Sequence, residues 1–146
     1  MTASPRGAPL RLLHVVPTYL PALRYGGPIR SVHSLCRALA AQGHRTDVFT
    51  TNVDGPGDSD VPLETPVDLE GVNVTYYASR RLRRLYWSPP MRRALFGRVA
   101  DYDAVHVHAI YLWPTWIAAR AARNEPQTSG SLSKDVKGPS AAFAEP

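Results

Sequence analysis

The sequence has almost no cysteine, since Cys36 is the only one among 146 residues. A single cysteine cannot form a disulfide within the chain, so nothing asks for an oxidising compartment. No apolar run approaches the roughly 18 residues of a membrane-spanning helix. The N-terminal segment MTASPRGAPLRLLHVV also lacks the uninterrupted apolar core of a secretory signal peptide. We therefore expect a cytoplasmic protein, and peripheral association with the inner face of the membrane is compatible with this expectation.

Acidic residues are scarce relative to basic ones. Lysine and arginine number 17 against 12 aspartates and glutamates, which gives a net charge of +5. This balance permits an anionic ligand, a membrane surface or nucleic acid, and does not choose between them. The hydrophobic content of 44% and the charged content of 20% are ordinary for a soluble globular protein. The length suffices for one domain with its own core.

The first third of the sequence predicts a strand, a helix and a second strand. Residues 10–16 are largely apolar and stop at Pro17, which indicates a buried strand. Pro28 suits the first turn of a helix, and Gly43 suits its end. We place Arg30, His33, Ser34 and Arg37 outside the apolar face of this helix, which consists of Ile29, Val32, Leu35, Cys36, Leu39 and Ala40. With a strand over residues 48–51, the order predicts a βαβ unit and a parallel sheet.

The remaining segments follow from the same signals. They are a polar loop over residues 52–70, a strand over 72–78, a short helix over 91–100, a strand over 104–108 and a helix over 114–123. From Asn124 onward the sequence is rich in proline, glycine and serine and has no periodicity, which predicts a disordered tail. We therefore expect a partial Rossmann-like α/β domain over residues 1–123, with a parallel sheet flanked by helices, and a tail over 124–146.

Two adjacent glycines, Gly26 and Gly27, separate the first predicted strand from the first helix. Glycines there let backbone N–H groups approach a ligand, and a helix N-terminus favours an anion. Arg30 in the first helical turn could add positive charge. The pattern therefore suits a phosphate group, although a plain Gly-Gly turn fits it equally well. A dinucleotide fingerprint fits less well, because the spacing is not G-x-G-x-x-G and the second strand does not end in an acidic residue.

Two segments resemble the N-terminal half of the family 4 glycosyltransferases: LHVVPTYLPALRYGGPIRSVHSLCRALAAQGHRTDVFTTN and DYDAVHVHAIYLWPTW. The shared features are the Gly-Gly loop with its arginine, the helix end ALAAQGH that leads into the strand residues VFT, and the DAVHVH strand. The resemblance covers residues 10–123 and implies the acceptor-side half of a two-domain GT-B fold. It also implies retaining transfer from a nucleotide sugar to a glycan or lipid-linked acceptor, as in polysaccharide or glycolipid assembly. We expect neither a metal ion nor another cofactor.

The resemblance also implies site residues. Gly26 and Gly27, with Arg30, are expected over the diphosphate of the donor. His108, at the end of the fourth strand, is expected near the reacting sugar as the catalytic residue, donating a hydrogen bond to a hydroxyl or to developing charge. His106 is the second choice, because we expect it on the opposite face of the strand. A histidine satisfied by neighbouring backbone is the alternative for both.

The donor-binding half of the family does not follow in this sequence. After the last predicted helix comes NEPQTSGSLSKDVKGPSAAFAEP, where the family continues into another buried strand. We therefore expect the isolated chain not to transfer sugar. The alternatives are an inactive truncated fragment, a non-catalytic domain that binds a phosphorylated ligand, and one half of a split glycosyltransferase.

A basic segment interleaved with apolar residues spans residues 80–98. Its arginines Arg80, Arg81, Arg83, Arg84, Arg92 and Arg93, with Arg98, have no acidic residue among them. They suit an anionic membrane or a lipid-linked acceptor, where each basic residue contributes about 1 kcal/mol. A solvated arginine-rich face is the alternative, and no nucleic-acid-binding motif is present. Trp87 and Trp113 are expected in the core, with sugar stacking as the second interpretation.

Overall fold

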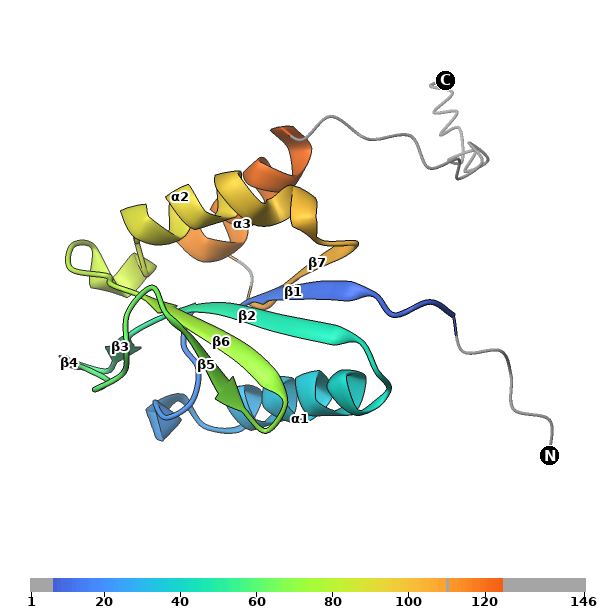
Figure 1. The fold of residues 1–146 in the computed structure, drawn as a ribbon. Coiled ribbons are helices and arrows are strands. Elements are labelled where there is room, and N and C mark those ends of the chain that lie inside the picture. Colours follow the sequence, from blue (N-terminus) through green and yellow to red (C-terminus); the bar gives the residue numbers. More distant parts are fainter. Residues whose placement is uncertain (1–6, 110, 125–146) are drawn as a thin grey trace, which may run out of the picture.

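The computed structural model describes residues 7–109 and 111–124, and it is an α/β domain built on one main sheet (Figure 1). The sheet has five strands in the order β5-β6-β2-β1-β7. These strands are β1 (Arg11–Val15), β2 (Arg45–Thr51), β5 (Pro66–Leu69), β6 (Val72–Tyr77) and β7 (Ala104–Val107). All neighbours pair in parallel except β5, which runs antiparallel to β6. The predicted α/β class and the four predicted strands are therefore confirmed.

Helices cover both faces of the sheet. Helix α1 (Gly27–Ala41) lies against one face, and α2 (Pro89–Arg98) and α3 (Trp113–Asn124) lie against the other (Figure 1). Three short 3₁₀ helices link these elements: η1 (Leu23–Tyr25), η2 (Arg83–Leu85) and η3 (Val99–Asp101). Ser88 begins α2, where its hydroxyl oxygen accepts a hydrogen bond from the Met91 amide. Within the described residues, no helix has the length and apolar character needed to cross a membrane.

The prediction of a polar loop over residues 52–70 is wrong. The segment contains a small hairpin, β3 (Val53–Asp54) with β4 (Gly57–Asp58), and then strand β5. Strand β5 turns into β6 through Glu70 and Gly71, whose φ angles are 55° and 87°. Two positive φ angles in a two-residue connection are typical of the tight turns that join antiparallel strands. Pro66 opens β5, and a proline is tolerated there because β5 is an edge strand.

Each face of the sheet carries its own apolar core. Leu13, Val15 and Phe49 pack with residues of α2 and α3, such as Met91 and Ile117. On the other face, Val48, Val72 and Val74 pack with Ile29 and Cys36 of α1. Because side chains alternate along a strand, neighbouring residues of β1 and β2 serve opposite cores. The sheet is thus sandwiched over its central strands.

The apolar face predicted for α1 is partly wrong. His33 is buried although we placed it outside that face, and Leu35 is 40% exposed. The contact stripe runs through Ile29, His33 and Cys36, whose spacing of four and three residues brings them onto one side of the helix. His33 is satisfied there because its Nδ1 lies 2.8 Å from the Tyr19 hydroxyl and its Nε2 lies 2.7 Å from Glu70 Oε2.

The end of the chain is described only in part. Helix α3 extends to Asn124, one residue beyond the predicted boundary. Asn124, the first residue of the tail predicted over residues 124–146, instead ends α3, and residues 125–146 lie outside the described residues.

Candidate functional site

The Gly-Gly loop forms the N-terminus of α1. Gly26 precedes the helix with φ 74° and ψ −141°, Gly27 is its first residue, and Pro28 follows in the first turn. No side chain of the capping residue accepts from the helix, and the first turn holds no acidic residue. The backbone N–H groups of Gly27, Ile29 and Arg30 are therefore free of a side-chain cap. An uncapped helix N-terminus attracts an anion through these groups and the helix dipole.

The space around the two glycines is open. A Cβ built on Gly26 or on Gly27 would meet no heavy atom within 4 Å, and both residues are exposed. Only Gly26 needs the conformational freedom of glycine, since its φ is positive. Arg30 is exposed, and among the described residues it makes no ion pair. The role of these three residues at a diphosphate remains a prediction.

The segment before the glycines is tied to the β3–β4 hairpin. The amide of Gly55 donates to the Tyr25 hydroxyl over 3.1 Å, and Arg24 Nε lies 3.5 Å from Asp54 Oδ1. Further back, the Tyr76 hydroxyl donates to the carbonyl of Leu20. The approach to α1 is therefore held from both the hairpin and the sheet, which fixes the direction in which the helix N-terminus points.

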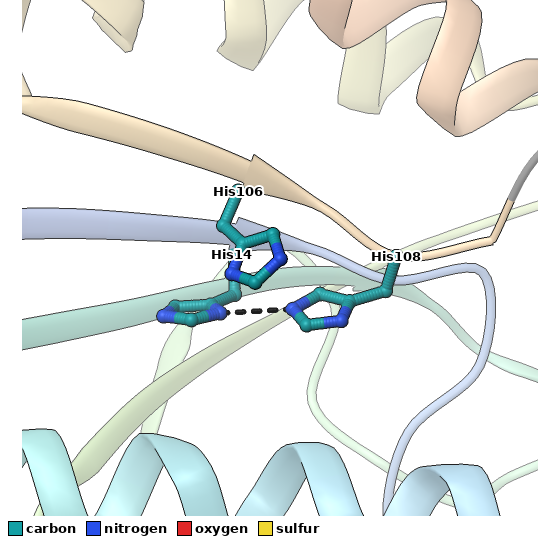
Figure 2. Close-up of side chains that lie close together, drawn as sticks. All are labelled: His14, His106 and His108. Atoms are coloured by element: carbon teal, nitrogen blue, oxygen red, sulfur yellow. Dashed lines mark hydrogen bonds between the residues drawn. The ribbon is translucent and has the colours of Figure 1, made fainter.

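Three histidines meet at the edge of the sheet beside β7. His14 lies on β1 directly opposite His106 on β7, and His108 follows β7 at its carboxyl end. Figure 2 shows all three rings on the same side of these strands, with His14 and His108 joined by a hydrogen bond. The ring centroids of His106 and His108 are 4.2 Å apart, and each lies 5.2 Å from that of His14. We name this group the histidine cluster.

The predicted orientation of His106 is wrong. Residues two apart on a strand point to the same face, because the side-chain period of a strand is two. His106 and His108 therefore face together toward the side of the sheet that α1 covers, and His14 joins them from β1. The sequence interpretation did not single out His14. A signal was available, since His14 is the only polar side chain in the apolar end of the first strand.

His14 and His108 have lowered pKa values, so both rings are neutral near pH 7. Burial lowers the pKa of His14 from 6.5 to about 4, with smaller contributions from His108 and His106. Burial likewise lowers the pKa of His108 to about 4, and the neighbouring His106 adds to this effect. A neutral imidazole has one N–H donor and one acceptor nitrogen. The bond between His14 Nδ1 and His108 Nε2, at 2.9 Å, needs one of each, so the tautomers of the two rings are linked.

This link determines what His108 presents to its surroundings. If His108 Nε2 accepts from His14, then His108 Nδ1 carries the proton and can donate. If Nε2 donates, then Nδ1 is an acceptor. In both cases one ring nitrogen of a half-buried histidine is left for a ligand at the carboxyl end of β7.

The basic segment divides into two groups. Arg80, Arg81, Arg84, Arg92 and Arg93 are exposed, as the solvated-face and membrane interpretations both require. Arg83 instead contacts Asp58 and the carbonyls of Gly57 and Ser79, which ties η2 to the hairpin.

Arg98 also has a structural role. It lies over the Phe49 ring at 5.2 Å and 4.0 Å from buried Asp47. Asp47 additionally accepts from the Tyr102 hydroxyl over 2.7 Å.

The two tryptophans lie beside the core rather than on an open platform. The rings of Trp87 and Trp113 meet edge to face with centroids 6.5 Å apart, and Trp113 packs against the core between the sheet and α2/α3. Both are partly buried. Trp116, in contrast, is 60% exposed and stands near exposed Leu85 and Tyr111. Leu85, Tyr111 and Trp116 thus line one shallow pocket, and Leu85 directly follows exposed Arg84.

The chain was compared with protein-family models, curated proteins and solved structures. Residues 26–129 match the model of the family described as glycosyl transferase 4-like domain. No curated protein matches the chain significantly, and no solved structure does. The matched segment begins at Gly26 and contains α1, the sheet from β2 onward, His106 on β7 and His108 just after β7.

Proposed function

Because its residues 26–129 match the family model, the chain belongs to the glycosyl transferase 4-like domain family, and we propose that it forms the acceptor-side part of a nucleotide-sugar-dependent retaining glycosyltransferase. In this proposal the donor diphosphate binds at the N-terminus of α1. His108 lies beside the reacting sugar, and the acceptor is a glycan or a lipid-linked glycan.

The observation that carries the proposal is the position of the uncapped glycine-bounded helix and His108 relative to the sheet. Strands β1 and β7 are parallel neighbours, so their carboxyl ends meet at one end of the sheet. The loop after β1 leads to Gly26, and His108 follows β7. In open α/β sheets, ligands bind outside the carboxyl ends of the strands. The backbone proposed to bind phosphate and the histidine proposed to act at the sugar are therefore at the same end of the sheet.

The helix N-terminus orients the donor more than it holds it. An anion at such a terminus gains about 0.3–2 kcal/mol, whereas micromolar binding needs about 8 kcal/mol. Arg30 adds a positive charge in the first turn. The remaining binding energy must come from the nucleotide and sugar. A weak contact to the diphosphate is suited to sugar transfer. The diphosphate is the leaving group, and it gains negative charge as the glycosidic bond to it breaks, so the contact strengthens in the transition state.

His108 is proposed to act through its remaining ring nitrogen. As a donor, this nitrogen can bind a sugar hydroxyl or stabilise charge that develops during transfer. His14 is a positioning residue, since its bond to Nε2 fixes the ring and selects its tautomer.

The acceptor surface is proposed to lie over η2, α2 and the start of α3. Exposed arginines and exposed apolar side chains occur together there, including Arg84, Arg92, Leu85 and Trp116. Arginines suit anionic headgroups, and the apolar side chains suit the acyl region just beneath. This supports a lipid-linked acceptor presented at an anionic membrane surface.

Donor binding gives the direct test. Saturation-transfer NMR with millimolar UDP- and GDP-sugars should show signals from the diphosphate-linked nucleotide, and Gly27→Ala should weaken them. Gly97→Ala is the matched control, because Gly97 lies on α2 and an added Cβ meets nothing within 4 Å. Absence of donor binding, or equal binding by both variants, would contradict the proposal.

Turnover separates the enzyme from a binding domain. Radiolabelled nucleotide sugars and a panel of lipid-linked acceptors should be assayed with the chain and with His108→Ala. Transfer lost in His108→Ala would support the catalytic role. Donor binding without transfer is the result expected of the isolated chain, and it does not separate the acceptor-side part of an enzyme from a domain that binds phosphorylated ligands.

A further inference from the structure

The histidine cluster brings together three ring nitrogens that are of the kind that coordinate metal ions. One ring nitrogen from each of His14, His106 and His108 lies within 4.8 Å of the other two. His14 comes from β1, His106 from β7 and His108 from the position just after β7, where its amide donates to the Val15 carbonyl. The register that places His14 opposite His106 is fixed by the β1–β7 ladder. Three imidazoles are thus brought together by backbone pairing, not by flexible loops.

We propose that the histidine cluster binds a divalent transition-metal ion of the zinc class, with His14, His106 and His108 as its three protein ligands. Zinc–nitrogen bonds are about 2.0–2.1 Å long, so nitrogens in a tetrahedral site lie about 3.4 Å apart. The His14 and His108 nitrogens already lie 2.9 Å apart. Rotation of the exposed His106 ring can bring in the third ligand.

The chemistry of the cluster selects the class of metal. Imidazole nitrogen suits Zn²⁺, Co²⁺, Ni²⁺ and Cu²⁺, whereas Mg²⁺ and Ca²⁺ prefer oxygen ligands. Among the described residues the group contains histidines alone and no carboxylate. The site would therefore bind a transition metal and leave hard cations in solution.

The burial of the cluster suits an open site. His14 is 2% exposed, His108 is partly buried and His106 is exposed. The ion can enter from the side of His106, the exposed ligand, and three protein ligands leave a fourth coordination position open. Three histidines with one open position are typical of zinc that binds water or a ligand oxygen. The proposal does not depend on sugar transfer, and its test uses the metal alone.

Metal titration of the untagged chain tests the proposal. Isothermal titration with Zn²⁺ should give one ion per chain, and Co²⁺ should give the visible absorption of a four-coordinate site. His106→Ala should weaken Zn²⁺ binding at least about tenfold. His44→Ala is the matched control, because His44 contacts the Leu10 amide outside the cluster and should leave binding unchanged.

Two further variants keep the test decisive. His108→Ala should weaken Zn²⁺ binding as His106→Ala does. His14 is buried, so His14→Ala is interpreted only with circular dichroism that shows the native fold. Mg²⁺ should produce no heat of binding at the same concentration. The proposal would be overturned if wild type, His106→Ala and His108→Ala bound Zn²⁺ equally. The absence of any Zn²⁺ binding below millimolar concentration would also overturn it.

Discussion

His14 Nδ1 and His108 Nε2 lie 2.9 Å apart, although 94 positions separate the two residues in the sequence. The contact joins the first strand of the sheet to the end of its last strand. It also places a buried polar side chain against a half-buried one, so each ring satisfies a nitrogen of the other.

The contact predicts unequal costs for removing the histidines. His14→Ala should lower the free energy of unfolding by about 1–3 kcal/mol, because it removes a buried side chain and leaves Nε2 of half-buried His108 without its partner. His106→Ala should change it by less than about 0.5 kcal/mol, since that side chain is exposed. Urea unfolding of metal-free protein measures both values. Equal losses of unfolding free energy in the two variants would show that His14 does not stabilise the β1–β7 edge of the sheet.

The two glycines of the loop should respond differently to alanine. Gly26→Ala should destabilise the fold by about 1–2 kcal/mol, because its φ of 74° disfavours a Cβ. Gly27→Ala should stay within about 0.5 kcal/mol, since nothing fills the space around it. Thermal and urea unfolding give the comparison. A large loss in Gly27→Ala would mean that this residue is needed for the fold and cannot serve as a clean probe of ligand binding.

Glu70 should make a pH-dependent contribution to stability. The hydrogen bond from His33, with a smaller effect of Arg37, lowers the pKa of Glu70 below 4.5. The unfolded carboxyl then binds a proton more readily than the folded one, so the stabilisation is present above about pH 4.5 and is lost as pH falls through the folded pKa. Unfolding midpoints of wild type and Glu70→Gln should differ near pH 7 and converge as the pH falls below the folded pKa of Glu70. A constant difference would contradict this.

The exposed arginines should bind anionic vesicles. Arg92→Gln with Arg93→Gln should weaken binding to phosphatidylserine vesicles at least about tenfold, at about 1 kcal/mol per basic residue. Salt at 1 M should release the protein, because screening shortens to about 3 Å. Arg24→Gln with Arg37→Gln removes the same charge from the α1 side and serves as the control. Equal binding to neutral vesicles, measured by co-sedimentation, would rule out an electrostatic surface.

The sequence predicted the parts of the fold that depend on local signals. The apolar runs and the proline and glycine positions located β1, β2, β6, β7 and all three helices. Strand β5 was missed because it has only four residues, begins with a proline and lies at the edge of the sheet, where it is held by pairing with β6. The burial of His33 was missed because it depends on Tyr19 and Glu70, which come from other elements.

The candidate site shows the same division. Gly26, Gly27 and His108 could be selected from their places at the ends of predicted elements. The histidine cluster could not be predicted whole, because it requires the register between β1 and β7. The face shared by His106 and His108 was available from their spacing alone.

The position of β7 bears on the order in which the chain folds. Leu12 of β1 pairs with Thr46 on one side and with Ala104 on the other, so the second contact closes a much longer loop. Among the described strands, β7 has β1 as its one neighbour, whereas β2 is paired on both sides. We therefore expect β7 to dock late and to open first, with faster amide exchange at His106 than at Phe49. The histidine cluster exists only while β7 is docked. A ligand that bridges the two strands would consequently slow this local opening and raise the protection of β7 above that of the free protein.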